Sequence, residues 1–169
     1  MDKDSVLIFL ALIKEAVKEK AKAAEIQEID GENVLFCSVD SPFEEGKDIV
    51  YQFSVNSVQG GCVICEIIIF AVNDVESKYY ADINRLVNRL NQYLTLGSFR
   101  LSEDVQSVMF VQGAVLDERI STDTAAEILG NTLAVMENTV NNSGAYFMSL
   151  LGGENIDALL ERIDKEVMS

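Results

Sequence analysis

The spacing Cys62-x-x-Cys65 is the feature of this sequence that comes nearest to a reactive site. At a helix N-terminus two cysteines so spaced form a redox pair, because the local field lowers the thiol pKa. Here they begin the apolar run 62–72, which predicts a strand. Residues three apart on a strand face opposite ways and lie roughly 10 Å apart, beyond the disulfide reach of about 7 Å. The sequence therefore predicts that Cys37, Cys62 and Cys65 are separate, buried, structural thiols.

Histidine is absent from the sequence, which removes the residue that most hydrolase mechanisms and many metal sites use. The pair Gly46-Lys47 could belong to a phosphate-binding loop. However, Ser41 stands where such a loop needs its first glycine, and Asp48 follows the lysine. We therefore predict no catalytic, cofactor-binding or metal-binding residue, and no cofactor. The protein is expected not to be an enzyme.

Paired acidic residues occur at strand ends, where they could serve as general acids and bases or as calcium ligands. The pairs are Glu44/Glu45, Glu103/Asp104 and Asp117/Glu118. No calcium-loop spacing occurs, so we interpret them as solvated turn residues. Asn141-Asn142-Ser143 matches the glycosylation pattern, which carries no weight without a secretion signal.

The composition is that of an ordered globular protein. The 169 residues are 49% hydrophobic and include one proline, which predicts a single domain, 1–169. The 28 acidic and 13 basic residues give a net charge of -15. This charge repels phosphate backbones and acidic lipid surfaces, so we expect neither nucleic acid nor a membrane among the partners.

The first apolar run, residues 6–13, follows the net-acidic start Met1-Asp2-Lys3-Asp4 instead of the basic region of a signal peptide. It is also too short to span a bilayer. We interpret residues 5–23 as a helix, and we expect a cytoplasmic protein. Because its first two turns are apolar nearly all round, this helix has more apolar surface than one contact face needs.

Residues 79–120 combine the clearest structural signals. Apolar positions recur at steps of three and four along 79–94, which predicts an amphipathic helix. They are Tyr79, Ile83, Leu86, Val87, Leu90 and Leu94. Gly97 suits the left-handed residue after a helix, and strands are predicted at 98–102 and 106–116.

Three further strands are predicted before this helix, at 33–39, 49–55 and 62–72, and their short connections favour an antiparallel meander. The runs 62–72 and 108–111 are apolar at consecutive positions, which is typical of strands covered on both faces. We therefore expect both to be interior strands with two covered faces.

A long helix is predicted from the capping residues 121–124 to the double glycine Gly152-Gly153, with a soft middle at 141–144. Its buried stripe is expected at Ile128, Leu129, Thr132, Val135, Met136 and Val140. Residues 156–167 form a last short helix. The fold class is therefore α+β: helix, three-strand antiparallel meander, helix, two strands, long helix and short C-terminal helix.

Three segments resemble the YbjN-like family, described as bacterial sensory transduction regulators. They are NRLVNRLNQYLTLGSF at 84–99, LDERISTDTAAEIL at 116–129 and FMSLLGGENIDALL at 147–160. Where that family often has proline, this chain has Thr122 and Glu154. The resemblance implies a fold similar to type III secretion chaperones, which are small acidic dimers that bind unfolded segments of other proteins. The family has no established catalytic residues, so none is transferred to this chain.

Two functions follow as hypotheses. The first is a non-enzymatic cytoplasmic protein-interaction module, chaperone-like or regulatory, which binds another polypeptide of basic character. The alternative is a small-molecule sensor domain with a pocket between sheet and long helix. We also expect a homodimer sealed by the first helix, whose apolar residues include Leu7, Ile8 and Phe9.

Overall fold

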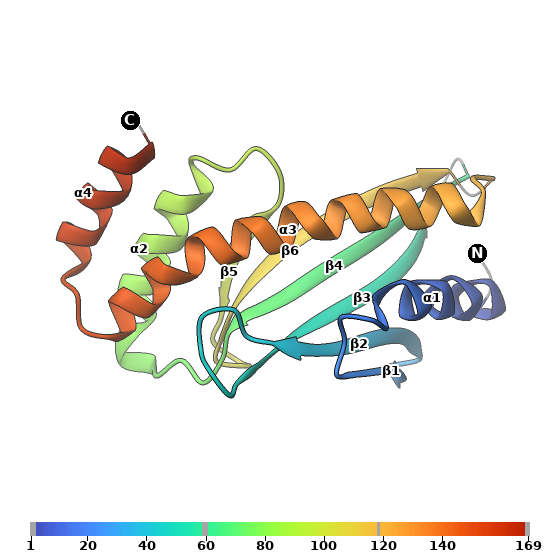
Figure 1. Cartoon of the computed structure of the whole chain (residues 1–169), viewed down its shortest axis with the longest axis horizontal. Coiled ribbons are helices and arrows are strands. Elements are labelled where there is room, and N and C mark those ends of the chain that lie inside the picture. The colour runs from blue at the N-terminus through green and yellow to red at the C-terminus, as the bar shows by residue number, and fades with distance from the viewer. Residues whose placement is uncertain (1–2, 59–60, 118, 168–169) are drawn as a thin grey trace.

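The structure is a computed structural model that describes residues 3–58, 61–117 and 119–167 (Figure 1). Within these ranges, four α-helices and a short 3-10 helix accompany one six-stranded antiparallel sheet. The strands are β1 Ala23–Ile29, β2 Glu32–Asp40, β3 Asp48–Val58, β4 Cys62–Val72, β5 Ser98–Ser102 and β6 Ser107–Asp117. The helices are α1 Lys3–Val17, η1 Ser77–Tyr79, α2 Tyr80–Asn91, α3 Thr122–Leu151 and α4 Ile156–Val167. The predicted α+β class and the order of the predicted elements are confirmed.

The sheet order is β1-β2-β3-β4-β6-β5, so the first four strands form a meander and β6 lies between β4 and β5. β4 and β6 pair along most of their lengths, from Cys62 opposite Asp117 to Phe70 opposite Met109. Both are therefore interior strands of the sheet, as their apolar sequences predict.

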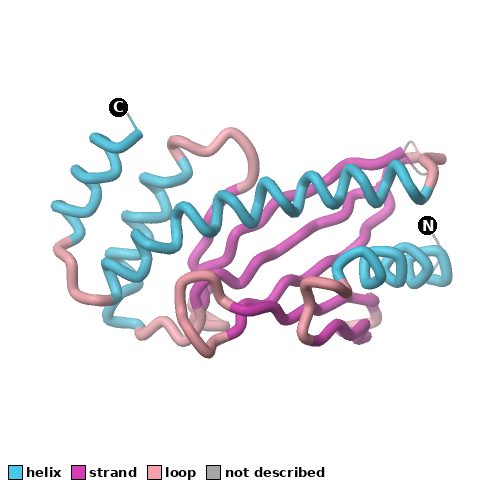
Figure 2. Tube along the Cα trace, viewed as in Figure 1, coloured by secondary structure: helices cyan, strands magenta, loops and turns pink. Residues whose placement is uncertain are grey.

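The helices form a layer against one face of this sheet (Figure 2). α1 contacts β2 and β3, α3 runs across β4 and β6, and α2 packs against β5 and α3. α4 extends this layer beyond the sheet and is held to α2 by an ion pair between Arg89 and Asp164, whose nitrogen and oxygen are 2.6 Å apart. Among the described residues, no helix lies on the opposite face of the sheet (Figure 1).

The first helix is shorter than predicted. α1 ends at Val17, and residues 23–29 form β1, the first strand of a meander with four strands instead of three. The backbone N–H of Ala21 donates to the Val17 carbonyl at 3.0 Å and closes the helix. Lys22 then pairs with Asp40 and Asp48 of the neighbouring strands. Pairing with β2 thus outweighs the helix propensity of this alanine-rich segment.

The connection from α2 to β5 has the predicted turn at Gly97, but α2 ends at Asn91, three residues before the predicted end at Leu94. Ile83, Leu86, Val87 and Leu90 are the buried residues of α2. Gly97 has a φ of 69°, and a Cβ there would lie 2.5 Å from the Phe110 ring. The Asn91 side chain accepts from the Phe99 N–H at 2.8 Å and donates to the Phe99 carbonyl at 2.9 Å. The helix and the strand are therefore tied together across the glycine turn.

α3 is one continuous helix, and its soft middle does not break it. Leu129, Met136 and Val140 of the predicted stripe are buried. The assignment of Val135 to that stripe is wrong, because 46% of this residue is exposed. The buried stripe follows the helical period through Leu133 instead, which lies on the same side as Leu129.

Within the described part of the chain, the prediction that both faces are covered is wrong for β4. In β6, Val111 of the predicted run 108–111 faces away from the helices and is 7% exposed, so only the end of that strand beyond the run is open. Along β4, the side chains that face the helices are buried, and those that face the other way remain partly exposed. Ile67 and Ile69 are 0% exposed, whereas Ile68 between them is only half-buried. Val115 of β6 is 67% exposed. We call this second surface the open face, and the surface under the helices the covered face.

Candidate functional site

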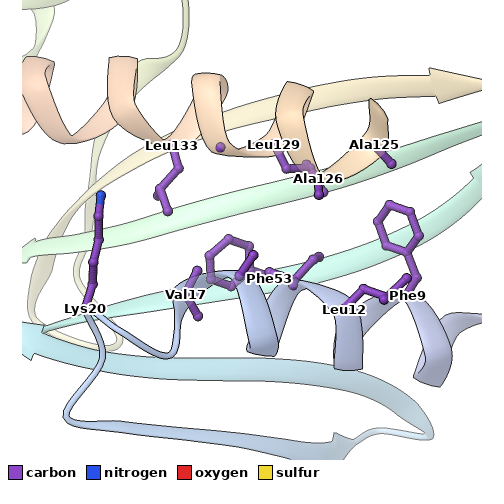
Figure 3. Close-up of a pocket in the computed structure, with 12 residues that line it drawn as sticks. Phe9, Leu12, Val17, Lys20, Phe53, Ala125, Ala126, Leu129 and Leu133 are labelled. Atoms are coloured by element: carbon purple, nitrogen blue, oxygen red, sulfur yellow. The ribbon is translucent and has the colours of Figure 1, made fainter. Parts of the chain in front are cut away.

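A cavity of about 190 Å³ lies between α1, α3 and the covered face of β3 (Figure 3). Phe53 of β3 lies against it, and apolar side chains of the two helices form its walls. Figure 3 shows Phe9 pointing from α1 toward α3 and Leu133 pointing from α3 toward the sheet. We call this cavity the groove. Its lining is almost wholly apolar, so it suits apolar ligand groups.

Small residues keep the two helices from filling this space. Ala16 lines the groove from α1, and Ala125, Ala126 and Gly130 line it from α3. A Cβ added at Gly130 would meet no heavy atom within 4 Å. Because glycine inside a helix costs about 1 kcal/mol relative to alanine, Gly130 keeps the groove wide at the expense of stability.

Polar side chains meet at one end of the groove. Lys20, which lines the cavity, pairs with Glu137 of α3 at 3.0 Å. The Tyr51 hydroxyl donates to the other oxygen of the same carboxylate at 3.2 Å. Burial, followed by the negative charge of Glu137, raises the pKa of Tyr51, so this hydroxyl stays protonated. A ligand in the groove therefore meets apolar side chains and, at one end, Lys20, whose ammonium group is held by Glu137.

The outer side of α1 extends the apolar surface beyond the groove. Leu10 and Ile13 turn toward the core and are 0% and 5% exposed. Leu12, which lines the groove, and Leu7, which lies beyond it, are each 38% exposed, and Ile8 is 64% exposed. The excess of apolar surface predicted for this helix is therefore present in the structure.

The cysteines lie apart as separate free thiols, as predicted. Cys65 faces the helices and is 0% exposed, whereas Cys62 faces the open side of β4. Burial raises the pKa of the Cys37 thiol to about 11 and that of the Cys65 thiol to about 12. The prediction that Cys62 is buried is wrong, because it lies on the open face and is only half-buried.

The other sequence candidates are dispersed. Lys47 pairs with Glu44 at 3.0 Å within the loop between β2 and β3. Glu103 and Asp104 are exposed in the turn between β5 and β6. Asp117 accepts from Arg119, whose guanidinium holds the pKa of that carboxyl well below its usual range. Glu118 lies outside the described residues, and Asn141 and Asn142 are exposed on α3.

Among the described residues, no group of three or more histidine, cysteine, aspartate or glutamate side chains could hold a metal ion. No helix that the structure describes is both long enough and apolar enough to cross a membrane.

The groove was not located by the sequence analysis, although a pocket between sheet and long helix was part of the alternative hypothesis. A signal for it exists in Ala126 and Gly130, which are four residues apart and therefore share one side of α3. A pair of small residues beside a predicted apolar stripe indicates either close helix packing or an unfilled space. The sequence does not distinguish the two, because that depends on how far α1 lies from α3.

No protein-family model matches this chain, and no curated protein matches it either.

Proposed function

We propose that this protein is a non-enzymatic, cytoplasmic module that binds another polypeptide, in a chaperone-like or regulatory role. The groove between α1 and α3 is the observation that carries this proposal. The resemblance of three segments to the YbjN-like family supports it, since the fold associated with that family resembles chaperones that hold segments of other proteins.

The dimensions of the groove favour a polypeptide over a free metabolite. Its volume of about 190 Å³ is below the roughly 300 to 1,000 Å³ of most small-molecule sites, but it accommodates one or two apolar side chains. Leu7 and Ile8 continue the apolar surface outside it. An amphipathic helix laid along α1 would insert its anchor side chains into the groove and cover those residues.

Charge indicates the character of the partner. α3 carries Asp123, Glu127 and Glu137 and no basic residue, in a chain whose net charge is -15. A partner segment with lysine or arginine beside its apolar face would therefore be attracted, and this attraction would weaken as salt rises.

The second candidate function is a sensor of a small apolar acid. The observation that favours it is the position of Lys20 at the end of the groove, where an ammonium group could pair with a ligand carboxylate. Lys20 already pairs with Glu137, so such a ligand would have to compete with that carboxylate.

A matched pair of α3 variants tests the proposal. Gly130→Leu fills the groove, and Asn131→Leu adds the same side chain at the next, exposed position outside the groove lining. The probes are two fluorescein-labelled amphipathic peptides with one leucine face, one flanked by lysines and one by glutamates. We expect the lysine peptide to bind the wild-type protein and Asn131→Leu alike, and to lose about tenfold or more in affinity with Gly130→Leu, since filling a desolvated pocket removes its anchor.

Equal binding of the lysine peptide to both variants would contradict the assignment of the groove. If neither peptide binds, and native mass spectrometry finds a small metabolite on the wild-type protein that Gly130→Leu lacks, the sensor function replaces the polypeptide function.

A further inference from the structure

The open face of the sheet has a band of apolar residues across its two central strands. We call it the apolar band. In the register of β4 and β6, three pairs of side chains lie side by side on this face: Ile64 with Val115, Ile68 with Val111, and Phe70 with Met109. All six come from strands in the middle of the sheet, where no sheet edge interrupts them. Val115 is 67% exposed and Val111 only 7% exposed, and the other four are half-buried.

Polar side chains border this band on both sides. β3 presents Gln52 and Ser54 beside β4, with the apolar Val50 only next to Phe70, and β5 presents Ser98 and Arg100 beside β6. An apolar centre with a polar rim is the usual anatomy of a protein interface. An antiparallel sheet that faces water normally carries polar residues on that side. Apolar side chains on this face would therefore be stabilised by contact with another surface, which the described helices do not provide.

Two opposite charges lie on the open face without an ion-pair partner among the described residues. They are Glu66, between the rows of Ile64 and Ile68, and Arg100 on β5. Glu66 lies opposite Gly113, which has no side chain to cover it. A two-fold axis that lies in the plane of the face, midway between the two side chains, would place a second copy face to face with the first. Glu66 of each copy would then lie beside Arg100 of the other.

The size of the face matches the area that a stable dimer needs. β3, β4 and β6 have 11 residues each and β5 has 5. At about 3.4 Å per residue and about 4.8 Å between strands, they span roughly 600 Å². Standard interfaces bury about 600 to 1,000 Å² per partner, so one copy could cover the band of another.

We infer that two copies of this chain associate through their open faces, with the apolar bands in contact and Glu66 of each copy paired with Arg100 of the other. In a chain with a net charge of -15, the centre of this face carries one acid and one base, so an identical acidic copy can approach it without burying like charges. This surface differs from α1, whose apolar residues led to the expectation of a dimer sealed by that helix. The inference does not depend on the groove, which lies on the other side of the sheet.

A charge exchange tests the pairing. Arg100→Glu and Glu66→Arg each place like charges together, so each variant alone should dissociate about tenfold or more readily than the wild-type dimer. An equimolar mixture of the two should form a heterodimer, because each copy then offers the charge that the other lacks. Native mass spectrometry distinguishes the heterodimer by mass, and analytical ultracentrifugation gives the dissociation constants.

Controls separate this surface from the rest of the molecule. Val115→Lys lies on the apolar band and should weaken the dimer, whereas Val135→Lys, an exposed valine of α3, should leave it unchanged. Ile8→Lys on α1 should also leave it unchanged. Thermal melts establish that each variant is folded.

Three results would overturn the inference. The first is a wild-type protein that stays monomeric at about 100 μM, which is about 100-fold above a dissociation constant of about 1 μM. The second is a dimer that Ile8→Lys dissociates and Arg100→Glu does not, which would assign the interface to α1. The third is a failure of the mixed single variants to recover the dimer that each has lost.

Discussion

The two faces of the sheet carry similar residues in different environments. On the covered face, Phe53, Ile67 and Ile69 are at most 1% exposed and belong to one continuous core with the helices. On the open face, Ile68 and Phe70 are only half-buried, although they come from the same strand as Ile67 and Ile69. Residue type therefore did not decide which side of β4 is buried. The position of the helices did, because the described helices lie against one face of the sheet only.

The largest effect expected from this comparison is the difference between Phe110→Ala and Phe70→Ala. Phe110 is 0% exposed on the covered face, with its ring centroid 4.8 Å from that of Phe99. Its truncation should lower the free energy of unfolding by about 3 to 5 kcal/mol, because the surrounding core cannot close the cavity. Phe70 lies half-buried on the open face, and its truncation should cost the monomer about 1 to 2 kcal/mol. Urea denaturation measures both values at a concentration at which the protein is monomeric. Equal losses would mean that the open face is as well packed as the covered face.

A smaller effect is expected within the helical layer itself, at Gly144 of α3. A Cβ there would lie 2.5 Å from the Phe43 ring, which the loop between β2 and β3 places against the helix. Overpacking costs about 1 to 3 kcal/mol, which exceeds the roughly 1 kcal/mol that alanine adds to a helix. Gly144→Ala should therefore destabilise the protein in a thermal or urea melt. Phe43→Ala combined with Gly144→Ala should remove most of that loss, and no recovery in the double variant would point to a cause other than the ring.

Gly130→Ala is the matched substitution, fourteen residues earlier in α3 and beside the groove. We expect it to stabilise the protein, whereas Gly144→Ala destabilises it. The added methyl group meets no atom within 4 Å, so only the helix propensity changes. The free energy of unfolding should rise by about 0.5 to 1 kcal/mol. The same urea melt checks it, and a loss of stability would show that the groove is already filled at this position.

The smallest effect on stability is expected from chemical treatment of the cysteines. Their reactivity nevertheless shows which face of the sheet each thiol lies on. With the pKa of Cys65 raised to about 12, roughly one thiol in ten thousand is ionised at pH 8, and burial blocks access as well. Cys37 behaves similarly, with a pKa of about 11. A maleimide should therefore label only Cys62 in the folded protein, and reductants or chelators should leave Tm unchanged. Labelling of Cys65 at the rate of Cys62 would contradict the assignment of their faces.

The sequence predicted the elements whose local signals agree. The buried residues of α2 were predicted correctly because Ile83, Leu86 and Leu90 recur at the helical period. Gly97 marks the turn that follows the helix. β1 was missed because its alanines and glutamates favour a helix locally, and only its pairing with β2 makes it a strand. Val135 was misassigned although it fits the helical period of Ile128 and Thr132, because the buried stripe is centred one position further along, on Leu129, Leu133 and Met136.

The open face could not be predicted from strand patterns alone, because β4 is apolar on both sides. Tertiary packing decides it: α1, α2 and α3 pack on one face of the sheet, and α4 packs on α2 and α3. The groove depends on the distance between α1 and α3, which the sequence does not specify. No chemical site was predicted from the residues, and the proposed function accordingly depends on shape and charge.

The insertion of β6 between β4 and β5 has a consequence for how the chain folds as it is synthesised. The meander of β1 to β4 is complete at Val72, but the strand that pairs with the other edge of β4 begins only at Ser107. Until those residues have left the ribosome, β4 is an isoleucine-rich edge strand, which is a template for aggregation. Pairing of β4 with β6 also joins segments far apart in the sequence, so we expect it to limit the folding rate. Nascent chains halted before Ser107 should therefore need a chaperone of their own to remain in solution.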